Sequence, residues 1–284
     1  MGLCETCATA TGGSLGASRA DGRRPFSGSR ESTQLVLIPS YNTGPRLQQT
    51  VREARRFWTP VWVIIDGSTD GTGEGLARLA ADDPGLHLLI RPDNAGKGAA
   101  LLDGFRHAAA AGFTHALTMD ADGQHPAAVI PEFMSLSAAN PQALILGLPI
   151  FDGTAPSVRV KGRKVSNWLA RAETLGADIG DALCGFRVYP IEDLLAVMSS
   201  SRWMRGFDFD PEAAVRLVWR GLPLVNRSVP VRYLRPEEGG VSHFNYLRDN
   251  LLLAWMHFRL LGGLVWRLPR LMGGHVRSFL HSLR

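Results

Sequence analysis

The chain has 284 residues, of which 45% are hydrophobic and 20% charged, as in an ordinary globular protein. This composition excludes a fully disordered chain and a collagen, and the odd count of three cysteines favours a reducing compartment over a disulfide-stapled domain. The net charge is +5, and residues 246–284, with six arginines and one acid, account for all of it. A basic, apolar C-terminal segment favours an anionic membrane surface as partner and argues against nucleic acid.

Residues 1–33 are rich in Gly, Ser, Ala and Thr, and they show neither hydrophobic periodicity nor the apolar stretch of a secretory signal. We therefore predict a disordered N-terminal extension over this range. Cys4 and Cys7 form a CxxC pair within it. A zinc site normally needs four ligands and no second pair follows, so we interpret this pair as incidental.

From residue 34 onward, short apolar runs alternate with segments of helical periodicity. The runs expected to form strands are 35–38, 61–65, 87–90, 116–119 and 143–146. The segments expected to form helices are about 47–57, 73–82, 98–111 and 127–138. Continuously apolar runs are typical of parallel strands that are covered on both faces. The alternation predicts an α/β fold with a Rossmann-like, mostly parallel central sheet and flanking helices.

Polar clusters follow the first four expected strands, at the point where each strand ends. These clusters are 39–42, 66–72, 93–98 and 120–125. In open α/β sheets, ligands bind at the carboxyl ends of the strands. The four clusters therefore predict one ligand-binding crevice.

Several side chains in these clusters suit a nucleotide and a metal ion. Asp120 and Asp122 are paired carboxylates that can hold Mg²⁺ or Mn²⁺ against substrate phosphates, or else Asp122 and Gly123 only shape a turn. Asp66 can accept hydrogen bonds from a ribose or a base. Lys97 begins a helix, where anions are favoured, and can meet a diphosphate, unless it is simply solvated.

Other motifs of α/β enzymes are missing from the sequence. It has no P-loop, no third glycine of a dinucleotide fingerprint, no G-x-S-x-G elbow and no H-E-x-x-H. A NAD enzyme, a P-loop kinase, an α/β hydrolase and a zinc protease are therefore disfavoured. The enzyme class that these exclusions leave is a metal-assisted enzyme that binds its donor substrate through a nucleoside diphosphate.

Four ordered motifs resemble family 2 inverting glycosyltransferases with the GT-A fold. They are the segments 36–42, 64–72, 94–98 and 119–126, and the likeness continues through 184–190, 207–212 and 230–233. The resemblance implies a GT-A domain over 34–245, with a nucleotide-sugar half at 34–150 and an acceptor half at 151–245. Segment 119–126 is similar to dolichyl- and polyprenyl-phosphate sugar synthases. In the acceptor half, the stretch from Phe151 to Arg171 looks like a mobile loop.

A narrower likeness lies near the C-terminus, in 240–244, 248–250 and 255–259. These segments resemble glycosyltransferases of aryl-polyene (xanthomonadin-type) clusters, which implies a lipid acyltransferase as a partner. The Gln-x-x-Arg-Trp motif of processive synthases is absent, which favours transfer of one sugar. We expect a metal-dependent inverting glycosyltransferase that moves a sugar from a nucleoside-diphosphate sugar to a lipid-linked or hydrophobic acceptor. The alternative is a polyprenyl-phosphate sugar synthase; remoter ones are a sugar-nucleotide pyrophosphorylase and a non-catalytic nucleotide-sugar-binding module.

The resemblance also implies roles for individual residues. The expected nucleotide-sugar contacts are Pro39, Tyr41, Asn42, Asp66, Lys97, Asp120, Ala121 and Gln124. Asp122 and Asp120 would hold the divalent cation, and His125 would line the sugar side or only begin a helix. The candidate bases are Asp208, which we prefer, Asp181 and Asp210. A phosphate acceptor needs no base, and Arg187, Arg235 and His243 would then bind phosphate, although Arg187 also suits a buried ion pair.

The tail at 246–284 is expected to form two amphipathic helices separated by Gly262 and Gly263. No segment is a convincing membrane span, because Arg259 stands near the middle of the most apolar stretch, 251–268. An apolar face recurs at helical spacing, and it comprises Leu247, Leu251, Ala254, Trp255, Phe258 and Leu261. This face is expected either to pack on the protein's own domain or to meet a membrane. The second possibility predicts a cytoplasmic protein held peripherally at the inner face of the cell membrane.

Overall fold

The structure is a computed structural model that describes residues 33–151, 157–232 and 244–282. Nearly all of the N-terminal extension expected over 1–33 lies outside the described residues, as do Arg235 and His243.

Across the described residues, seven strands form one sheet in the order β3-β2-β1-β4-β6-β5-β7. The strands are β1 Gln34–Ser40, β2 Val61–Asp66, β3 Leu86–Arg91, β4 His115–Thr118, β5 Leu144–Phe151, β6 Arg187–Pro190 and β7 Leu224–Val231. All neighbouring pairs are parallel except those of β6, which runs antiparallel to β4 and β5. The predicted α/β class and the five predicted strands are confirmed.

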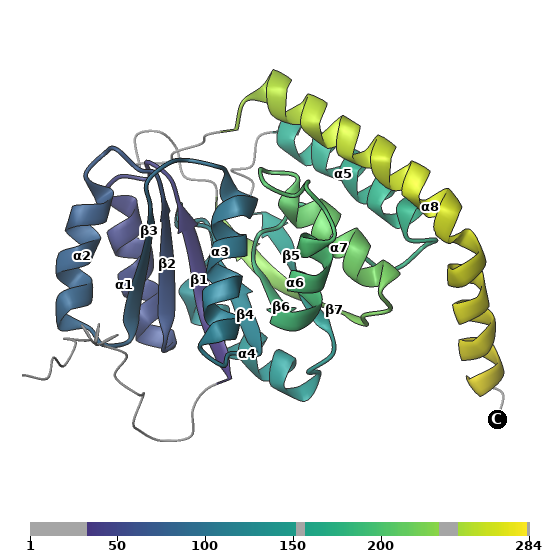
Figure 1. Ribbon diagram of the computed structural model, residues 1–284, viewed down its shortest axis with the longest axis horizontal. Coiled ribbons are helices and arrows are strands. Elements are labelled where there is room, and N and C mark those ends of the chain that lie inside the picture. Colours follow the sequence, from purple (N-terminus) through teal and green to yellow (C-terminus); the bar gives the residue numbers. More distant parts are fainter. Residues whose placement is uncertain (1–32, 152–156, 233–243, 283–284) are drawn as a thin grey trace, which may run out of the picture. The chain divides into compact units, whose positions relative to one another are not determined.

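Helices cover both faces of this sheet (Figure 1). One face is packed by α1 Arg46–Phe57, α2 Thr72–Asp82 and α4 Ile130–Ala139, and the turn η1 Ala127–Val129 leads into α4. The other face is packed by α3 Lys97–Ala110, α6 Ile191–Ser199 and α7 Phe209–Trp219. The structure therefore has the three layers expected of a sheet with two buried faces.

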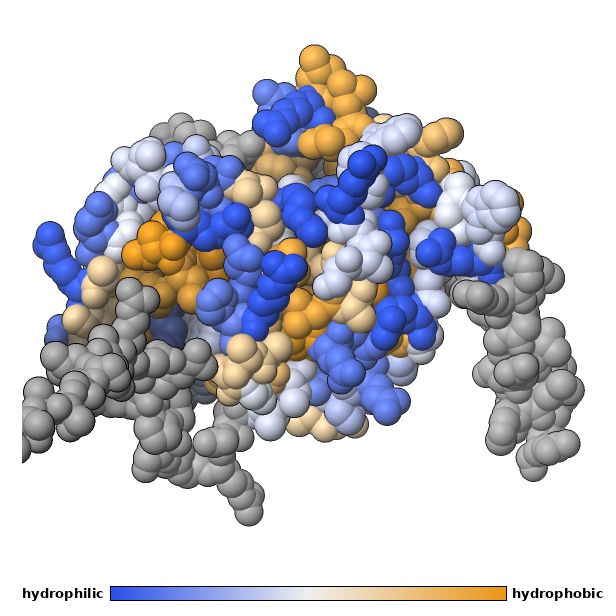
Figure 2. Space-filling model, in the orientation of Figure 1, coloured by the Kyte–Doolittle hydropathy of each residue, from blue (hydrophilic) through white to orange (hydrophobic). Residues whose placement is uncertain are grey.

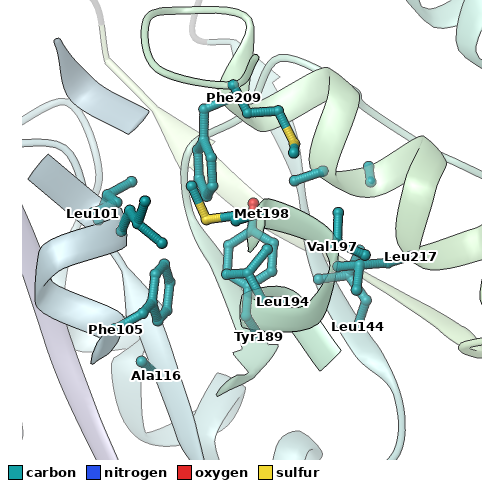
Figure 3. Packing of buried hydrophobic residues seen from close by; sticks show 14 of the residues in the cluster. Leu101, Phe105, Ala116, Leu144, Tyr189, Leu194, Val197, Met198, Phe209 and Leu217 are labelled. Atoms are coloured by element: carbon teal, nitrogen blue, oxygen red, sulfur yellow. The ribbon is translucent and has the colours of Figure 1, made fainter. Parts of the chain in front are cut away.

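Side chains of the central strands alternate between two apolar clusters. Leu35 and Leu37 of β1 pack under α3, whereas Val36 and Ile38 between them pack under α1. Successive side chains of a strand point to opposite faces, so a strand buried on both faces must be apolar throughout. Figure 3 shows the cluster on the α3 side, where Phe105 meets Tyr189 edge to face with the ring centroids 5.9 Å apart.

The stretch expected to be a loop over 151–171 is instead mostly the helix α5 Ser157–Glu173. Its inward positions include Ser166 and Glu173, which are buried, whereas Val165 and Trp168 are 60% and 67% exposed. Polar side chains on the inward face, beside the buried Ala170, and apolar ones on the outward face depart from the usual amphipathic pattern. Hydrophobic periodicity therefore did not indicate this helix.

The two tail helices predicted from the glycine pair are one continuous helix, α8 Tyr246–Ser282. A Cβ atom added to Gly263 would lie 3.3 Å from the ring of Trp219, which belongs to α7. The glycine thus allows close packing between α8 and α7 without breaking the helix. Tertiary contacts of this kind outweigh the weak helix propensity of glycine.

The apolar face predicted on the tail is the outward face of α8. Leu247, Leu251 and Phe258 are 74%, 62% and 68% exposed. The helix packs on α5 and α7 through the opposite side, where Met256 and Leu260 are buried. Of the two possibilities left open by the sequence, packing of the predicted face on the domain is therefore wrong.

Tyr246–Leu268 is long and apolar enough to cross a membrane by length and composition alone, although Arg259 stands within it. Its inward face, however, makes polar contacts with the domain. Arg259 pairs with Glu212 on α7, and His257 pairs with Glu173 on α5. Because leaving these charges without partners is costly, the contacts favour a helix that lies on the domain.

Candidate active site

The polar loops predicted to line one crevice do meet at the carboxyl ends of β1 to β4. Parallel pairing of these four strands places their ends at one edge of the sheet. The loop after β1 contacts the loop after β2, because the amide of Thr69 donates to Asn42 Oδ1 at 2.8 Å and that of Asn42 donates to Ser68 Oγ at 3.0 Å. This agrees with the rule that open α/β sheets bind ligands at that edge.

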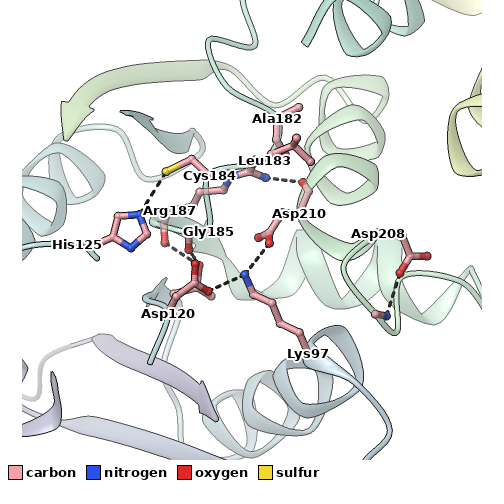
Figure 4. A network of polar contacts seen from close by, with 12 residues as sticks. Lys97, Asp120, His125, Ala182, Leu183, Cys184, Gly185, Arg187, Asp208 and Asp210 are labelled. Carbon is pink, nitrogen blue, oxygen red and sulfur yellow. Dashed lines mark hydrogen bonds and ion pairs between the residues drawn. The ribbon is translucent and has the colours of Figure 1, made fainter. Parts of the chain in front are cut away.

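Lys97 is the centre of a charged cluster at this edge (Figure 4). Its Nζ atom lies 2.7 Å from Asp120 Oδ1 and 2.7 Å from Asp210 Oδ2. Burial alone would lower the pKa of Lys97, but the two carboxylates outweigh burial and raise it. Lys97 therefore stays charged and joins the end of β4 to the first turn of α7. The sequence alone had suggested that Lys97 binds a diphosphate or is simply solvated.

Asp120 and Asp122 differ in what compensates their charge. Lys97 holds the pKa of Asp120 below its usual range, against the effect of burial. Burial, and then the charge of Asp120, raise the pKa of Asp122 to about 7. Asp122 Oδ1 accepts a hydrogen bond from the amide of Gln124 at 3.0 Å. The loop thus holds one carboxylate paired with Lys97 beside one that makes no ion pair with the residues that the structure describes.

This arrangement fits a divalent cation. Two aspartates supply the hard oxygen ligands that Mg²⁺ and Mn²⁺ prefer, and a cation would offset the burial and the charge of Asp120 that together raise the pKa of Asp122. Within the described residues, no group of three or more His, Cys, Asp and Glu side chains can hold a metal. Asp120 and Asp122 would therefore share the ion with phosphate oxygens of the substrate and with water.

Asp66 lies at the end of β2 and is 2% exposed. Its carboxylate accepts the amide of Gly96 at 2.9 Å and lies 3.4 Å from Nε of Arg91. These contacts join the loop after β2 to the start of α3. Arg91 directly follows the apolar run of β3, a position the sequence analysis did not single out. A direct contact of Asp66 with the nucleotide stays a prediction.

The other predicted nucleotide contacts surround this cluster. Pro39 and Ala121 are buried, whereas Tyr41, Asn42 and Gln124 are half-buried. His125 is 6% exposed, and burial lowers its pKa to about 4. Cys184, whose Sγ atom lies 3.7 Å from the His125 ring, is buried with its pKa raised to about 12, as expected of a core residue. His125 thus belongs to the wall beneath the site.

The three candidate bases are in different surroundings. Asp208 accepts amide hydrogen bonds from Gly206 and Met204, so it shapes the turn before α7 and lies apart from Lys97 (Figure 4). Asp181 pairs with Arg163 at 2.5 Å. Only Asp210, of these three, joins the Lys97 cluster, and its Oδ1 atom has no hydrogen-bond partner among the described residues. The structure therefore favours Asp210 over Asp208, which the sequence preferred.

Arg187 is fully buried and unavailable to a ligand. Its guanidinium donates to the carbonyl oxygens of Asp210, Asp181 and Ala182 at 2.5, 3.1 and 2.6 Å. These bonds tie β6 to the loop before it and to α7. Arg187 is buried, as the structural alternative expected, but its partners among the described residues are three carbonyl groups and the Tyr189 hydroxyl, so the expected ion pair is not observed.

The mostly parallel sheet with a carboxylate pair at its binding edge defines a GT-A-like fold. Residues 35–194 match Glycosyl transferase family 2. The chain therefore belongs to this family and is a glycosyltransferase.

Two curated relatives show the same relationship in sequence. The chain is 29% identical to an undecaprenyl-phosphate mannosyltransferase of Micrococcus luteus, over 81% of the chain and 99% of the relative. It is 31% identical to a polyprenol monophosphomannose synthase of Mycolicibacterium smegmatis, over 72% of the chain and 78% of the relative.

Solved structures are similar in fold. Glucosyl-3-phosphoglycerate synthase of Mycobacterium tuberculosis, in complex with Mn²⁺, UDP-glucose and phosphoglyceric acid, aligns with a TM-score of 0.56 and 17% identity, over 83% of this chain and 79% of that one. The mannosyltransferase PcManGT of Pyrobaculum calidifontis, in complex with GDP-mannose and Mn²⁺, aligns with a TM-score of 0.54 and 17% identity, over 89% and 76%. At this identity the likeness shows the fold alone.

Proposed function

We propose that the protein transfers one sugar, with inversion, from a nucleoside-diphosphate sugar to a polyprenyl phosphate at a membrane surface. The observation that carries this proposal is the cluster of Lys97, Asp120, Asp122 and Asp210 at the binding edge of a family 2 glycosyltransferase. The curated relatives named above support the polyprenyl-phosphate acceptor, which the sequence analysis held as the alternative to a broader class of hydrophobic acceptors.

On the donor side, Asp120 and Asp122 would hold Mg²⁺ or Mn²⁺. The solved structures with Mn²⁺ and a UDP- or GDP-sugar support this choice of cation. A cation bound there would neutralise the nucleoside diphosphate that leaves. The loops that carry Asn42, Asp66 and Gly96 are tied together by hydrogen bonds, so they present a preformed surface to the nucleotide.

On the acceptor side, a phosphate changes the role of Asp210. Phosphate oxygens are already ionised near neutral pH, so no general base has to remove a proton from them. Asp210 then holds the Lys97 ammonium beside Asp120, where it adds positive charge next to the leaving diphosphate. If the acceptor were a hydroxyl group instead, Asp210 would be the candidate base.

The outward faces of α8 and α5 would contact the lipid part of the acceptor. Apolar side chains gather along the first part of α8 with hydrophilic ones beside them (Figure 2). Alongside, α5 exposes Trp168 among the basic residues Lys161, Lys164 and Arg171. Aromatic and apolar groups with a basic rim favour an anionic lipid surface. We propose that the protein binds peripherally to the cytoplasmic face of the cell membrane.

A donor panel and an acceptor pair test the chemistry. Calorimetry with UDP-, GDP- and dTDP-sugars, each with Mn²⁺ and with EDTA, should show metal-dependent binding of one donor. Asp122→Asn should weaken that binding by about tenfold or more, because one carboxylate ligand is lost. Asp82→Asn, an exposed carboxylate at the end of α2, is the matched control. Transfer should occur to polyprenyl phosphate and not to the free polyprenol; transfer only to the polyprenol would reject the phosphate acceptor.

Vesicle co-sedimentation tests the membrane surface. Replacing Leu251 and Phe258 together by serine should reduce binding to anionic vesicles without unfolding the protein, because both side chains are exposed. Phe57→Ser, at the end of α1 and 42% exposed, is the control. Added salt should weaken binding of the parent protein. Unchanged binding of the double variant would exclude this face as the lipid contact.

The aryl-polyene likeness and the lipid acyltransferase partner stay predictions of the sequence. Transfer to a polyene acceptor, assayed beside polyprenyl phosphate with the same donor, would distinguish these two acceptors. Release of nucleoside diphosphate during that reaction separates a transferase from a non-catalytic nucleotide-sugar-binding module, and release of pyrophosphate would indicate a pyrophosphorylase.

A further inference from the structure

The inward face of α8 carries an arginine that reaches the helix bearing Asp210. Arg259 Nη2 lies 2.8 Å from Glu212 Oε2, and its Nη1 lies 3.2 Å from Glu212 Oε1. Glu212 is fully buried, and the Arg259 side chain is only 13% exposed. Two parallel bonds from a guanidinium to a carboxylate set both distance and orientation, so this pair fixes where α7 sits against α8.

Glu212 is in the same first turn of α7 as Asp210, because the helix begins at Phe209. The ion pair of Asp210 with Lys97 is 2.7 Å long, and the second oxygen of Asp210 has no hydrogen-bond partner among the described residues. A shift of α7 along its axis would therefore separate Asp210 from Lys97. Glu212 and Asp210 therefore move together with the first turn of α7.

Arg259 also contacts the loop that packs on the first turn of α3, the helix that begins with Lys97. Its guanidinium stacks on Trp203, 4.1 Å from the ring centroid, in the loop between α6 and α7. Two residues further along this loop, the carbonyl oxygen of Arg205 accepts the amide of Ala99 at 3.0 Å, in the first turn of α3. One side chain of α8 thus touches both the first turn of α7, which carries Asp210, and the loop that packs on the first turn of α3, which begins with Lys97.

We propose that Arg259 is a positioning residue of the active site: it clamps the first turn of α7 and the Trp203 loop, so that Asp210 holds Lys97 beside Asp120. The helix α8 would then have two roles. Its outer face meets the lipid, and its inner face helps to position Lys97, Asp120 and Asp210. The inference rests on the proposed function only in taking this cluster as the site of transfer.

A second arginine of α8 provides a matched control. Arg267 also stacks on a tryptophan of the neighbouring helix, with its guanidinium 4.6 Å from the ring centroid of Trp219. Trp219 is at the C-terminal end of α7, far along the helix from Asp210. Substituting methionine at either position removes one guanidinium and one cation–π contact of α8, with the Trp203 loop for Arg259 and with α7 for Arg267. Only the change at Arg259 removes a contact with the first turn.

The first readout does not depend on any substrate. The chain has only three lysines, Lys97, Lys161 and Lys164, so amine acylation followed by mass spectrometry resolves each one. In Arg259→Met, acylation of Lys97 should rise several-fold relative to Lys161 and Lys164, and in Arg267→Met it should not. Glu212→Gln, which keeps the shape of Glu212 without its charge, should behave like Arg259→Met. Equal labelling of Lys97 in all variants, or an equal rise with Arg267→Met, would overturn the proposal.

The second readout is transfer kinetics. Arg259→Met should lower kcat by about tenfold or more, with the KM of the donor nearly unchanged. The reason is that displacement of Asp210 and Lys97 slows the chemical step. The double variant Arg259→Met with Glu212→Gln should lose less than the sum of the two single losses, since both changes break the same ion pair. Fully additive losses would contradict a shared contact. If the parent protein transfers no sugar while Lys97 labelling still responds, the clamp stands and the proposed acceptor is wrong.

Discussion

At the scale of single residues, the chemistry of the site depends on how charges are compensated. Lys97 pairs with Asp120 and Asp210, whereas Asp122 makes no ion pair within the part of the chain that the structure describes. A lysine held between two carboxylates keeps their repulsion low before any substrate binds. It also leaves Asp122 as the carboxylate whose charge a divalent cation would balance.

Removing Lys97 should therefore affect stability as well as transfer. In Lys97→Met, Asp120 and Asp210 lose their common counter-charge, and the free energy of unfolding should fall by about 3 kcal/mol, as for other broken buried pairs. Urea denaturation measures this change. Lys161→Met, at an exposed position of α5, is the control for stability. A Lys97→Met variant as stable as the parent would show that the two ion pairs do not stabilise the fold.

A second residue-scale prediction concerns pH. Two hydrogen bonds of 2.7 Å from Arg55 hold the pKa of Asp83 below its usual range, although burial opposes them. Because the pKa is lower in the folded state, the pair stabilises the protein above the unfolded pKa, and this contribution is lost as pH falls through the folded pKa. Asp83→Asn should cost about 1 kcal/mol at pH 7, since solvent screens the pair, and much less near pH 2. A cost independent of pH, measured by urea denaturation, would contradict this account.

At the scale of elements, the start of α3 is placed by a close approach of backbone. A Cβ atom added to Gly98 would meet the carbonyl oxygen of Met204 and lie 2.9 Å from Cβ of Phe209. Neither neighbour is the flexible end of a side chain. Gly98 therefore allows the first turn of α3, with Lys97, to lie against the loop that leads into α7.

Gly98→Ala should consequently push α3 and α7 apart. We expect a loss of about 1–3 kcal/mol in the free energy of unfolding, typical of overpacking, together with slower transfer. Gly162→Ala in α5 is the matched control, because a Cβ there meets nothing within 4 Å. That variant should be neutral or slightly more stable, since alanine favours helix by about 1 kcal/mol over glycine. Equal effects of the two changes would show that the contact with Met204 is unimportant.

Three of the elements that sequence periodicity missed, β6, β7 and α5, share a physical cause. The run of β6 is short and contains Arg187, whose burial is possible only because three carbonyl groups accept its hydrogen bonds. At the edge of the sheet, β7 carries polar residues such as Asn226 and Arg227 and is only partly buried. The inward positions of α5 are polar because their partners, such as His257, are polar too. Apolar patterning indicates burial in an apolar layer and cannot indicate burial by polar pairing.

At the scale of the whole molecule, α8 is part of the folded domain. Glu212 and Glu173 are fully buried, and they pair with Arg259 and His257 from α8. Met256 and Leu260 extend the apolar cluster that lies under α3 and α6. The apolar tail is thus joined to the catalytic domain through one face and free to meet lipid through the other.

Deleting residues 246–284 should therefore destabilise the protein and not merely release it from membranes. The deletion leaves Glu173 without the hydrogen bond from His257, leaves Glu212 with Arg216 alone, and uncovers apolar surface of the domain, for an expected loss of several kcal/mol, at least about 3 kcal/mol. Urea denaturation of the truncated and full-length chains measures this loss. Equal stability of the two chains would show that α8 does not stabilise the domain.

The sequence by itself determined where the ligand-binding edge is. Continuous apolar runs specify strands buried on both faces, and polar residues directly after them must gather at one edge of a parallel sheet. Asp66, Lys97, Asp120 and Asp122 were placed at that edge for this reason, and the structure has all four there. The order of the motifs was enough to predict the family.

Only the tertiary structure decided which side chains act together. Asp208 and Asp210 stand two apart in the sequence, yet one caps a turn and the other meets Lys97, which lies 113 residues away along the chain. The apolar stripe of α8 was visible in the sequence, but its outward orientation depends on the polar contacts of Arg259 and His257 with α7 and α5. The pattern of apolar and polar residues along the chain predicts whether each residue is buried or exposed. Ion pairing depends instead on partners that only the folded chain brings within a few ångströms.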